Sequence, residues 1–159
     1  MQDNIVLVRV DDRLIHGQVV TAWLNVYNNV QHIICIDDFS SKDSFMQKMF
    51  QLLIPKEVTV EIKSVEGAIE VLKSGLDEPT MIIVKTPATV KALIDAGIGI
   101  RKLNIGGMGM SGKRKRYCQH LSANEEEVAI MRELIDKGVK IEIQSIPSGP
   151  KYDCEEVLN

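Results

Sequence analysis

Val8 to Val19, with the sequence VRVDDRLIHGQV, is the stretch around which the rest of the chain is organised. Residues Ile5 to Val10 are mostly β-branched and apolar, which is typical of a strand buried on both faces. The charges of Asp11 to Arg13 then end that strand abruptly. We therefore expect His16 to lie in a turn at the carboxyl end of a strand.

A helix is predicted to begin near Gly17, because apolar residues recur at spacings of three and four after it. These residues are Val19, Val20, Trp23, Leu24 and Tyr27. In open α/β sheets this edge binds ligands, and helix N-termini there present free N–H groups. A histidine with Arg13 and Asp11 nearby suits phosphoryl or proton transfer. The alternative is an ordinary charged surface turn.

Length and composition favour one globular domain over residues 1–159. The chain has 45% hydrophobic and 26% charged residues, which excludes general disorder. Its formal net charge of −3 argues against a nucleic-acid-binding protein, which normally carries a basic balance.

No signal peptide or membrane-spanning run is evident in the sequence. The three cysteines, Cys35, Cys118 and Cys154, are odd in number and lack C-x-x-C spacing. They predict inert thiols in a reduced cytosolic protein rather than a metal or redox site.

Strands and helices are predicted to alternate along the chain. Further strands are expected at Ile33–Ile36, Val58–Ile62, Met81–Val84, Ile100–Ile105 and Val139–Ile143, each separated from the next by an amphipathic helical segment. The predicted fold class is α/β, an open, mostly parallel twisted sheet with helices on both faces. Tyr117–Leu121 is the candidate for one antiparallel edge strand, and Cys154–Leu158 for one helical turn.

Local signals predict where several helices begin. Ser40 or Ser41 is expected to cap a helix whose stripe of Met46, Met49, Phe50 and Leu53 faces the core. Ser64 is expected to cap the next helix, and Thr86-Pro87 to start another. Ser122 to Glu125 is interpreted as a capping box.

The segment Gly106 to Gly112 has more glycines than a simple connection needs. Glycines let backbone N–H groups approach an anion closely. The alternative is a flexible turn, because the spacing fits neither the Rossmann nor the P-loop pattern. Asp37 and Asp38, and also Lys85, follow other strands and are expected at the same edge.

Two motifs carry a resemblance to a known family. RVDDRLIHGQV, from Arg9 to Val19, resembles the signature of the IIB components of the mannose/sorbose family of the phosphoenolpyruvate-dependent sugar phosphotransferase system. NIGGM, from Asn104 to Met108, is similar to a glycine-rich segment late in the same family. The similarity extends from the first strand to Val139–Ile143.

The resemblance implies a phosphoryl carrier, a protein-Nπ-phosphohistidine:sugar phosphotransferase. His16 matches the histidine that accepts a phosphoryl group at Nδ1 from a phosphohistidine of a IIA partner and passes it to a sugar. Arg13 is expected to hold the phosphoryl oxygens with its planar fork of donors. Asp11 is expected to orient Arg13 or the imidazole, since two like charges would repel.

Three glycines are expected to support the same site. Gly17 leaves room for the phosphoryl group at the start of the first helix. Gly106 and Gly107 belong to the second motif of the resemblance. No metal and no cofactor are implied.

The implied partners are a IIA phosphohistidine domain, the membrane IIC and IID permease subunits and a sugar, with no nucleic acid. The implied location is cytoplasmic, with the protein peripherally associated with the membrane permease. The sequence names neither the sugar nor an oligomeric state, and a homo-oligomer stays open. It also leaves open the roles of Arg9, Asp37, Asp38 and the C-terminal tail.

The residues also allow three other interpretations. A signalling receiver domain would explain Asp11-Asp12, but it needs an aspartate after its third strand, where this chain has Lys63-Ser64. A nucleotide-binding module using Gly106 to Gly112 would leave His16 without a purpose. A cysteine-phosphorylated IIB protein is disfavoured because Cys35 lies inside a predicted strand.

The run Lys113 to Arg116 places four consecutive cations in an acidic protein, just after the glycine-rich segment. One interpretation is a solvated loop. The other is a basic patch that accelerates association with a phosphorylated partner.

Overall fold

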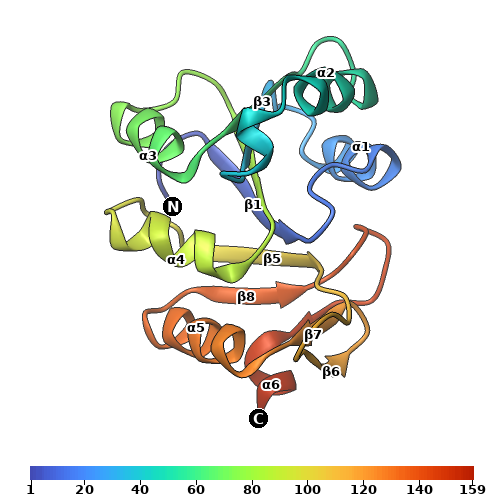
Figure 1. The fold of residues 1–159 in the computed structure, drawn as a ribbon, viewed down its shortest axis with the longest axis vertical. Helices are drawn as coiled ribbons and strands as arrows, with labels where there is room; N and C mark the ends of the chain where they lie inside the picture. The colour runs from blue at the N-terminus through green and yellow to red at the C-terminus, as the bar shows by residue number, and fades with distance from the viewer.

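The computed structural model describes residues 1–159, and its centre is a seven-stranded sheet with the order β3-β2-β4-β1-β5-β8-β9. Figure 1 shows β5 and β8 side by side in this sheet. The strands are β1 (Ile5–Asp11), β2 (His32–Ile36), β3 (Thr59–Lys63), β4 (Thr80–Val84), β5 (Lys102–Gly107), β8 (Lys140–Ile143) and β9 (Tyr152–Asp153). Every neighbouring pair is parallel except β8 with β9. The predicted fold class is confirmed.

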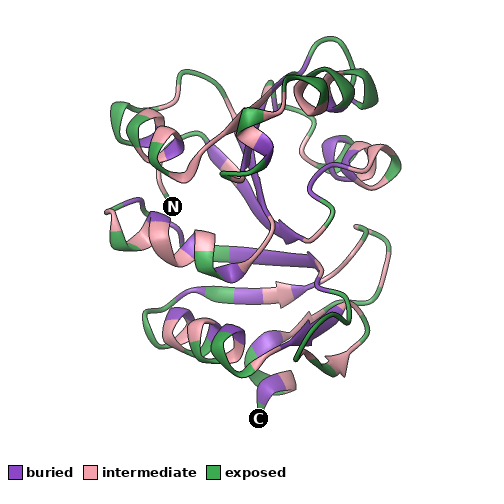
Figure 2. Ribbon diagram, in the orientation of Figure 1, coloured by how far each residue is buried: buried purple, intermediate pink, exposed green.

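Helices cover both faces of this sheet. On one face, α1 (Gly17–Val26) and α2 (Ser44–Leu53) share an apolar cluster with Leu7 of β1. On the other face, α3 (Val65–Ser74), α4 (Pro87–Asp95), α5 (Glu125–Asp136) and α6 (Cys154–Leu158) share a second cluster with Val8 and Val10. Side chains alternate along a strand, so β1 contributes to both clusters. Figure 2 shows the buried strands between the more exposed helices.

The predicted edge strand at Tyr117–Leu121 is wrong. The chain forms β6 (Lys115–Cys118) and β7 (Leu121–Ala123), which pair as a separate antiparallel hairpin. It reverses at His120, whose φ of 71° is left-handed. The antiparallel edge strand of the main sheet is β9, from the C-terminal tail. The predicted helical turn at Cys154–Leu158 is present as α6.

Two of the predicted helix starts are also displaced. Ser40 begins a short 3₁₀ helix, η1 (Ser40–Lys42), and Asp43 caps α2 by accepting hydrogen bonds from two backbone N–H groups. The capping box of α5 joins Asn124 and Glu127 rather than Ser122 and Glu125, because Ser122 belongs to β7. Ser64 caps α3 as expected. Thr86 is at the N-cap of α4 but makes no side-chain cap bond.

The predicted core stripe of α2 is half wrong. Phe50 is buried and Met46 packs against the core, but Met49 and Leu53 are exposed. The helix packs beside β3, the edge strand of the sheet, so only one of its sides meets other residues. The remaining apolar side chains of α2 face solvent.

Arg9 is the largest polar side chain in the interior, with 1% of its surface exposed. Its Nη1 donates to the Asn104 side-chain oxygen at 2.7 Å, and the guanidinium lies 5.5 Å from the Trp23 ring centre. The guanidinium also lies directly over Gly106 of β5, where a Cβ would overlap it. Glycine is therefore required at residue 106 to make room for a buried cation.

Gly106→Ala is expected to lower the free energy of unfolding by about 3 kcal/mol, because displacing Arg9 breaks its buried ion pair with the Asp11 carboxylate. Gly109→Ala is the matched control. A Cβ there meets only the Asp12 carboxylate at 3.8 Å, an ordinary contact. Urea unfolding of both variants measures the difference, and equal stability of the two would show that Arg9 moves aside at little cost.

Candidate functional site

The turn that follows β1 positions the site. The Leu14 N–H donates to the Asp11 carbonyl at 3.0 Å, and Leu14 has a left-handed φ of 58°. Such a conformation costs a non-glycine residue on the order of 1–3 kcal/mol. The side chains of Leu14 and Ile15 are buried in the cluster below α1, and this burial offsets the strain. The turn is thereby fixed, with His16 as the N-cap residue of α1.

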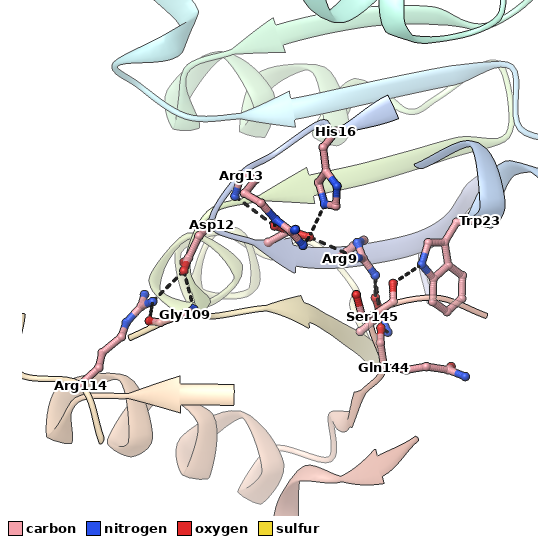
Figure 3. A network of polar contacts seen from close by, with 11 residues as sticks. Arg9, Asp12, Arg13, His16, Trp23, Gly109, Arg114, Gln144 and Ser145 are labelled. Carbon is pink, nitrogen blue, oxygen red and sulfur yellow. Dashed lines mark hydrogen bonds and ion pairs between the residues drawn. The ribbon is translucent and has the colours of Figure 1, made fainter. Parts of the chain in front are cut away.

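Asp11 is the centre of the site. Its side chain is fully buried, and its Oδ1 accepts hydrogen bonds from the backbone N–H and the Nε of Arg13, both at 3.0 Å. Its Oδ2 accepts from Nη2 of Arg13 and Nη2 of Arg9, both at 3.1 Å. Nε2 of His16 lies 3.2 Å from the same oxygen. Figure 3 shows the side chains of Arg9, Arg13 and His16 pointing toward one another.

The surroundings of Asp11 keep it ionised. Burial by itself would raise the pKa of this carboxyl, but the hydrogen bonds from Arg13 and His16 and the charge of Arg9 lower the pKa below its ordinary value. Two guanidinium groups against one carboxylate leave the cluster with a net charge of about +1 before the imidazole is counted. The site therefore favours an added anion.

His16 presents its second ring nitrogen outward. With Nε2 directed at Asp11, Nδ1 makes no hydrogen bond within the chain, and 27% of the side-chain surface is exposed. A carboxylate on Nε2 favours the tautomer with its proton there, so Nδ1 keeps a free electron pair. The first turn of α1 contains no acidic side chain, and its earliest N–H groups have no intrahelical acceptor.

Arg13 is half exposed, unlike Arg9. It uses Nε and Nη2 for Asp11, and its Nη1 makes no bond within the chain. One edge of the guanidinium is thus fixed by the carboxylate while the other remains available. Arg13 also borders a hollow of about 440 Å³ that Arg116 and His120 line from the hairpin side.

The glycine-rich segment is more ordered than its composition indicates. Gly106 and Gly107 belong to β5, and a Cβ at Gly107 would come within 3.1 Å of Arg13. The Met108 N–H donates to the His120 carbonyl, and the Gly109 N–H donates to Asp12. The N–H groups of residues 108 and 109 therefore already have partners within the chain. Gly17 lies beside Leu53, whose carbonyl oxygen would be 3.4 Å from a Cβ.

Asp12 and Arg114 form a connection that the sequence did not reveal. Nη1 of Arg114 donates to Asp12 at 2.8 Å and to the Gly109 carbonyl, while its Nε and Nη2 bind Glu127. Only 8% of the Arg114 side chain is exposed. This ion pair joins the turn after β1 to α5, as Figure 3 shows for its Asp12 side. The run Lys113 to Arg116 is consequently not one continuous patch.

The other acidic residues at this edge have structural contacts. Asp37 lies 3.4 Å from the Lys85 ammonium and accepts hydrogen bonds from Ser40, and Asp38 accepts one from the Val65 N–H. Neither contacts His16. Asp11 and Asp12 bind different cations, so they do not form the paired acidic pocket of a receiver domain.

The structure contains neither a candidate metal site nor a candidate membrane-spanning helix. No group of three or more histidine, cysteine, aspartate or glutamate side chains is arranged to hold a metal ion. None of the helices combines the length and the apolar character that crossing a membrane would require.

Comparison with known proteins supports the resemblance of the two motifs. Residues 5–159 match the model of the family described as PTS system sorbose subfamily IIB component. The chain is 32% identical to the fructose-specific EIIB component of Bacillus subtilis (strain 168), covering 98% of this chain and 96% of that protein. It is 28% identical to the mannose-specific EIIAB component of Escherichia coli (strain K12), where the match covers 96% of this chain and 48% of that protein.

Solved structures agree with these relatives. The IIBSor domain of the sorbose permease from Klebsiella pneumoniae superposes with a TM-score of 0.91 at 32% identity, covering 100% of this chain and 97% of that one. The receiver and nucleotide-binding interpretations are therefore wrong. The chain belongs to the sorbose subfamily of the IIB components of the phosphotransferase system, which are phosphotransferases that act with IIA and membrane components in sugar uptake.

Proposed function

We propose that His16 is the residue that carries the phosphoryl group, on Nδ1, between a IIA phosphohistidine and a sugar delivered by membrane IIC and IID subunits. The observation that carries this proposal is the contact between Nε2 of His16 and the buried carboxylate of Asp11 at 3.2 Å. It leaves Nδ1 as the unprotonated nucleophile of a partly exposed imidazole.

The transfer needs no proton to leave His16. The electron pair of Nδ1 attacks the phosphorus of the donor phosphohistidine, and the donor nitrogen takes back the electrons of its P–N bond. The imidazole of His16 then becomes positively charged, and the carboxylate of Asp11 stabilises this charge across Nε2–H. In the second step a sugar hydroxyl oxygen attacks the phosphorus, Nδ1 regains its electron pair, and the hydroxyl proton passes to water or to the freed Nδ1.

Arg13 supplies the phosphoryl clamp in this proposal. Its unoccupied Nη1 edge offers donors to the phosphoryl oxygens, while Asp11 holds the guanidinium plane in place. Gly17 provides space and free N–H groups at the start of α1. Gly106 and Gly107 support the site by making room for Arg9 and Arg13.

The setting of the protein follows from this role. We assign residues 1–159 to a single IIB domain that acts in the cytoplasm and associates peripherally with its membrane permease. The sugar is selected by the membrane subunits. The relative with EIIA and EIIB parts in one chain supports a IIA partner whose histidine meets His16 directly.

His16 is expected to be the only residue labelled when the protein is incubated with radioactive phosphoenolpyruvate, the general carrier proteins and IIA. The label should be lost in acid and retained in base, as for a phosphorus–nitrogen bond. Nitrogen-15 NMR of the phosphorylated imidazole distinguishes Nδ1 from Nε2. Undiminished labelling of His16→Ala, or attachment at Nε2, would contradict the proposal.

Arg13→Lys is expected to slow phosphoryl transfer from IIA about tenfold or more. Lysine keeps the charge but cannot bind Asp11 through two nitrogens and also face the phosphoryl group, and one lost hydrogen bond of about 1.4 kcal/mol gives that factor. Rapid-quench kinetics measure the rate. A wild-type rate in the lysine variant would remove Arg13 from the clamp.

The exposed cations of the hairpin are expected to accelerate the encounter with phosphorylated IIA. Lys115 and Arg116 make no ion pair within the chain, and Arg116 lines the hollow beside Arg13. The double variant Lys115→Glu/Arg116→Glu should lower the second-order transfer rate several-fold at low salt, because it removes the attraction between these cations and the anionic donor. At physiological ionic strength this attraction is screened beyond a Debye length of about 8 Å, so the effect of the substitutions should be smaller.

The control for this experiment is to measure both proteins over a range of salt concentrations. The rate of the wild-type protein should fall towards that of the double variant as the salt concentration rises, with thermal stability nearly unchanged by the substitutions. Arg114 is left intact because its bonds to Asp12 and Glu127 are structural. Rates that respond neither to salt nor to charge reversal would assign the run to an ordinary solvated loop.

A further inference from the structure

Helix α2 exposes a continuous row of apolar side chains. Phe45, Met49 and Leu52 follow one another at spacings of four and three, and Leu53 extends the row. Their exposed fractions are 69%, 40%, 85% and 43%. We call these four residues the apolar face of α2. Figure 2 shows this helix largely in the colour of exposed residues.

The apolar face of α2 contributes little to holding the helix on the protein. The helix is already attached to the protein by Phe50, which is buried, and by the side chains of Gln47 and Gln51, which bind the backbone of the chain around β3. Lys48 is the only charged residue among its ten. Contiguous exposed apolar groups of this kind mark surfaces that another molecule covers.

This face is continuous with the phosphoryl site. Leu53 lies against Gly17, the residue after His16. A Cβ added at Gly17 would be 3.6 Å from the Leu53 side chain, which is an ordinary contact distance. A shallow hollow of about 510 Å³ runs between α1 and the end of α2, lined by Gly17, Gln18, Thr21, Ala22, Asn25, Leu52 and Leu53. A partner that covers His16 from this side therefore also meets Leu52 and Leu53, the end of the apolar face of α2.

The two sides of the site differ in chemistry, and this difference selects the occupant. On the hairpin side, Arg13 and Arg116 line a hollow whose one carboxylate, Asp12, is already paired with Arg114, and this suits a brief encounter with an anionic phosphorylated donor. On the α2 side the hollow has no charged lining residue, and it joins uncharged polar side chains of α1 to the apolar face of α2. Apolar interfaces are characteristic of assemblies that stay together, whereas transient encounters use smaller and more polar surfaces.

We infer that the apolar face of α2 docks this protein on the membrane IIC and IID subunits of its phosphotransferase system, an inference that rests on the proposed function. The donor IIA then approaches His16 from the hairpin side. The two partners use different sides of one histidine, so the permease remains bound while IIA comes and goes.

Cosedimentation tests the inference. Purified protein is mixed with inverted membrane vesicles containing the cognate IIC and IID subunits, or with matched vesicles lacking them, in the absence of phosphoenolpyruvate. Wild-type protein is expected to sediment only with the first kind. Leu52→Glu and Phe45→Glu are each expected to lower the bound fraction about tenfold at a fixed vesicle concentration. The phosphorylation state of His16 does not enter this measurement.

Ala88→Glu is the matched control, since it adds the same charge at an exposed position of α4 on the opposite face of the sheet. It should bind like the wild type. All variants should accept phosphate from IIA at the wild-type rate, and this separates the docking surface from the proposed function. Circular dichroism melts check folding, and Leu52→Ser replaces Leu52→Glu if the latter unfolds.

Four results would overturn the inference. Binding to vesicles without the subunits would indicate a lipid surface. Self-association of the wild type that Leu52→Glu abolishes in sedimentation velocity would indicate a second copy of this chain. Slower labelling of Leu52→Glu by IIA would indicate that IIA covers this face. Unchanged cosedimentation of both variants would show that the face is not used for docking.

Discussion

The buried carboxylate of Asp11 is the constraint on which the site depends. A carboxylate removed from water needs compensating partners, and here it has two guanidinium groups, a backbone N–H and an imidazole. Two of these partners impose a structural requirement in turn. Arg9 requires a glycine at residue 106, and His16 can reach the carboxylate because the chain turns back at Leu14 with a left-handed backbone. Strand β5 and the turn after β1 are therefore shaped by one anion.

The same carboxylate links structure to chemistry. A guanidinium or an imidazole alone at the edge of a sheet would rotate freely. The entropy lost in ordering it would then add to the free-energy barrier of phosphoryl transfer. Asp11 orders both groups before a partner arrives. It also keeps the cluster close to one net positive charge, which allows the site to receive an anionic group without holding it so strongly that transfer onward is prevented.

The sequence predicted the alternation of strands and helices along the chain and the turn that holds His16, because both depend on local patterns. Apolar runs ended by charge define the strands, and the three-to-four spacing after Gly17 defines α1. Arg114 was beyond such reasoning. Within a run of four cations nothing distinguishes it, and its partner Asp12 lies 102 residues away in the chain. The hairpin strand was misplaced and β9 was not predicted for a similar reason, since very short strands are specified by contacts rather than by periodicity.

The exposed side chains of α2 show why the spacing of apolar residues gave a wrong prediction of the core at this helix. A stripe of methionine, phenylalanine and leucine predicts the core only if the helix has neighbours on that whole side. Because β3 is the last strand of the sheet, α2 meets the protein along a narrow line, and Phe50 alone is fully enclosed. The spacing of apolar residues in α2 predicts that these side chains pack against something. It does not distinguish packing within the chain from packing against a partner. Phe45 and Leu52, which lie outside the predicted stripe and are the most exposed of the large apolar side chains of this helix, are apolar where a helix facing only water would be polar. Their apolar character is explained by a partner that binds the protein beside His16 and covers these two side chains.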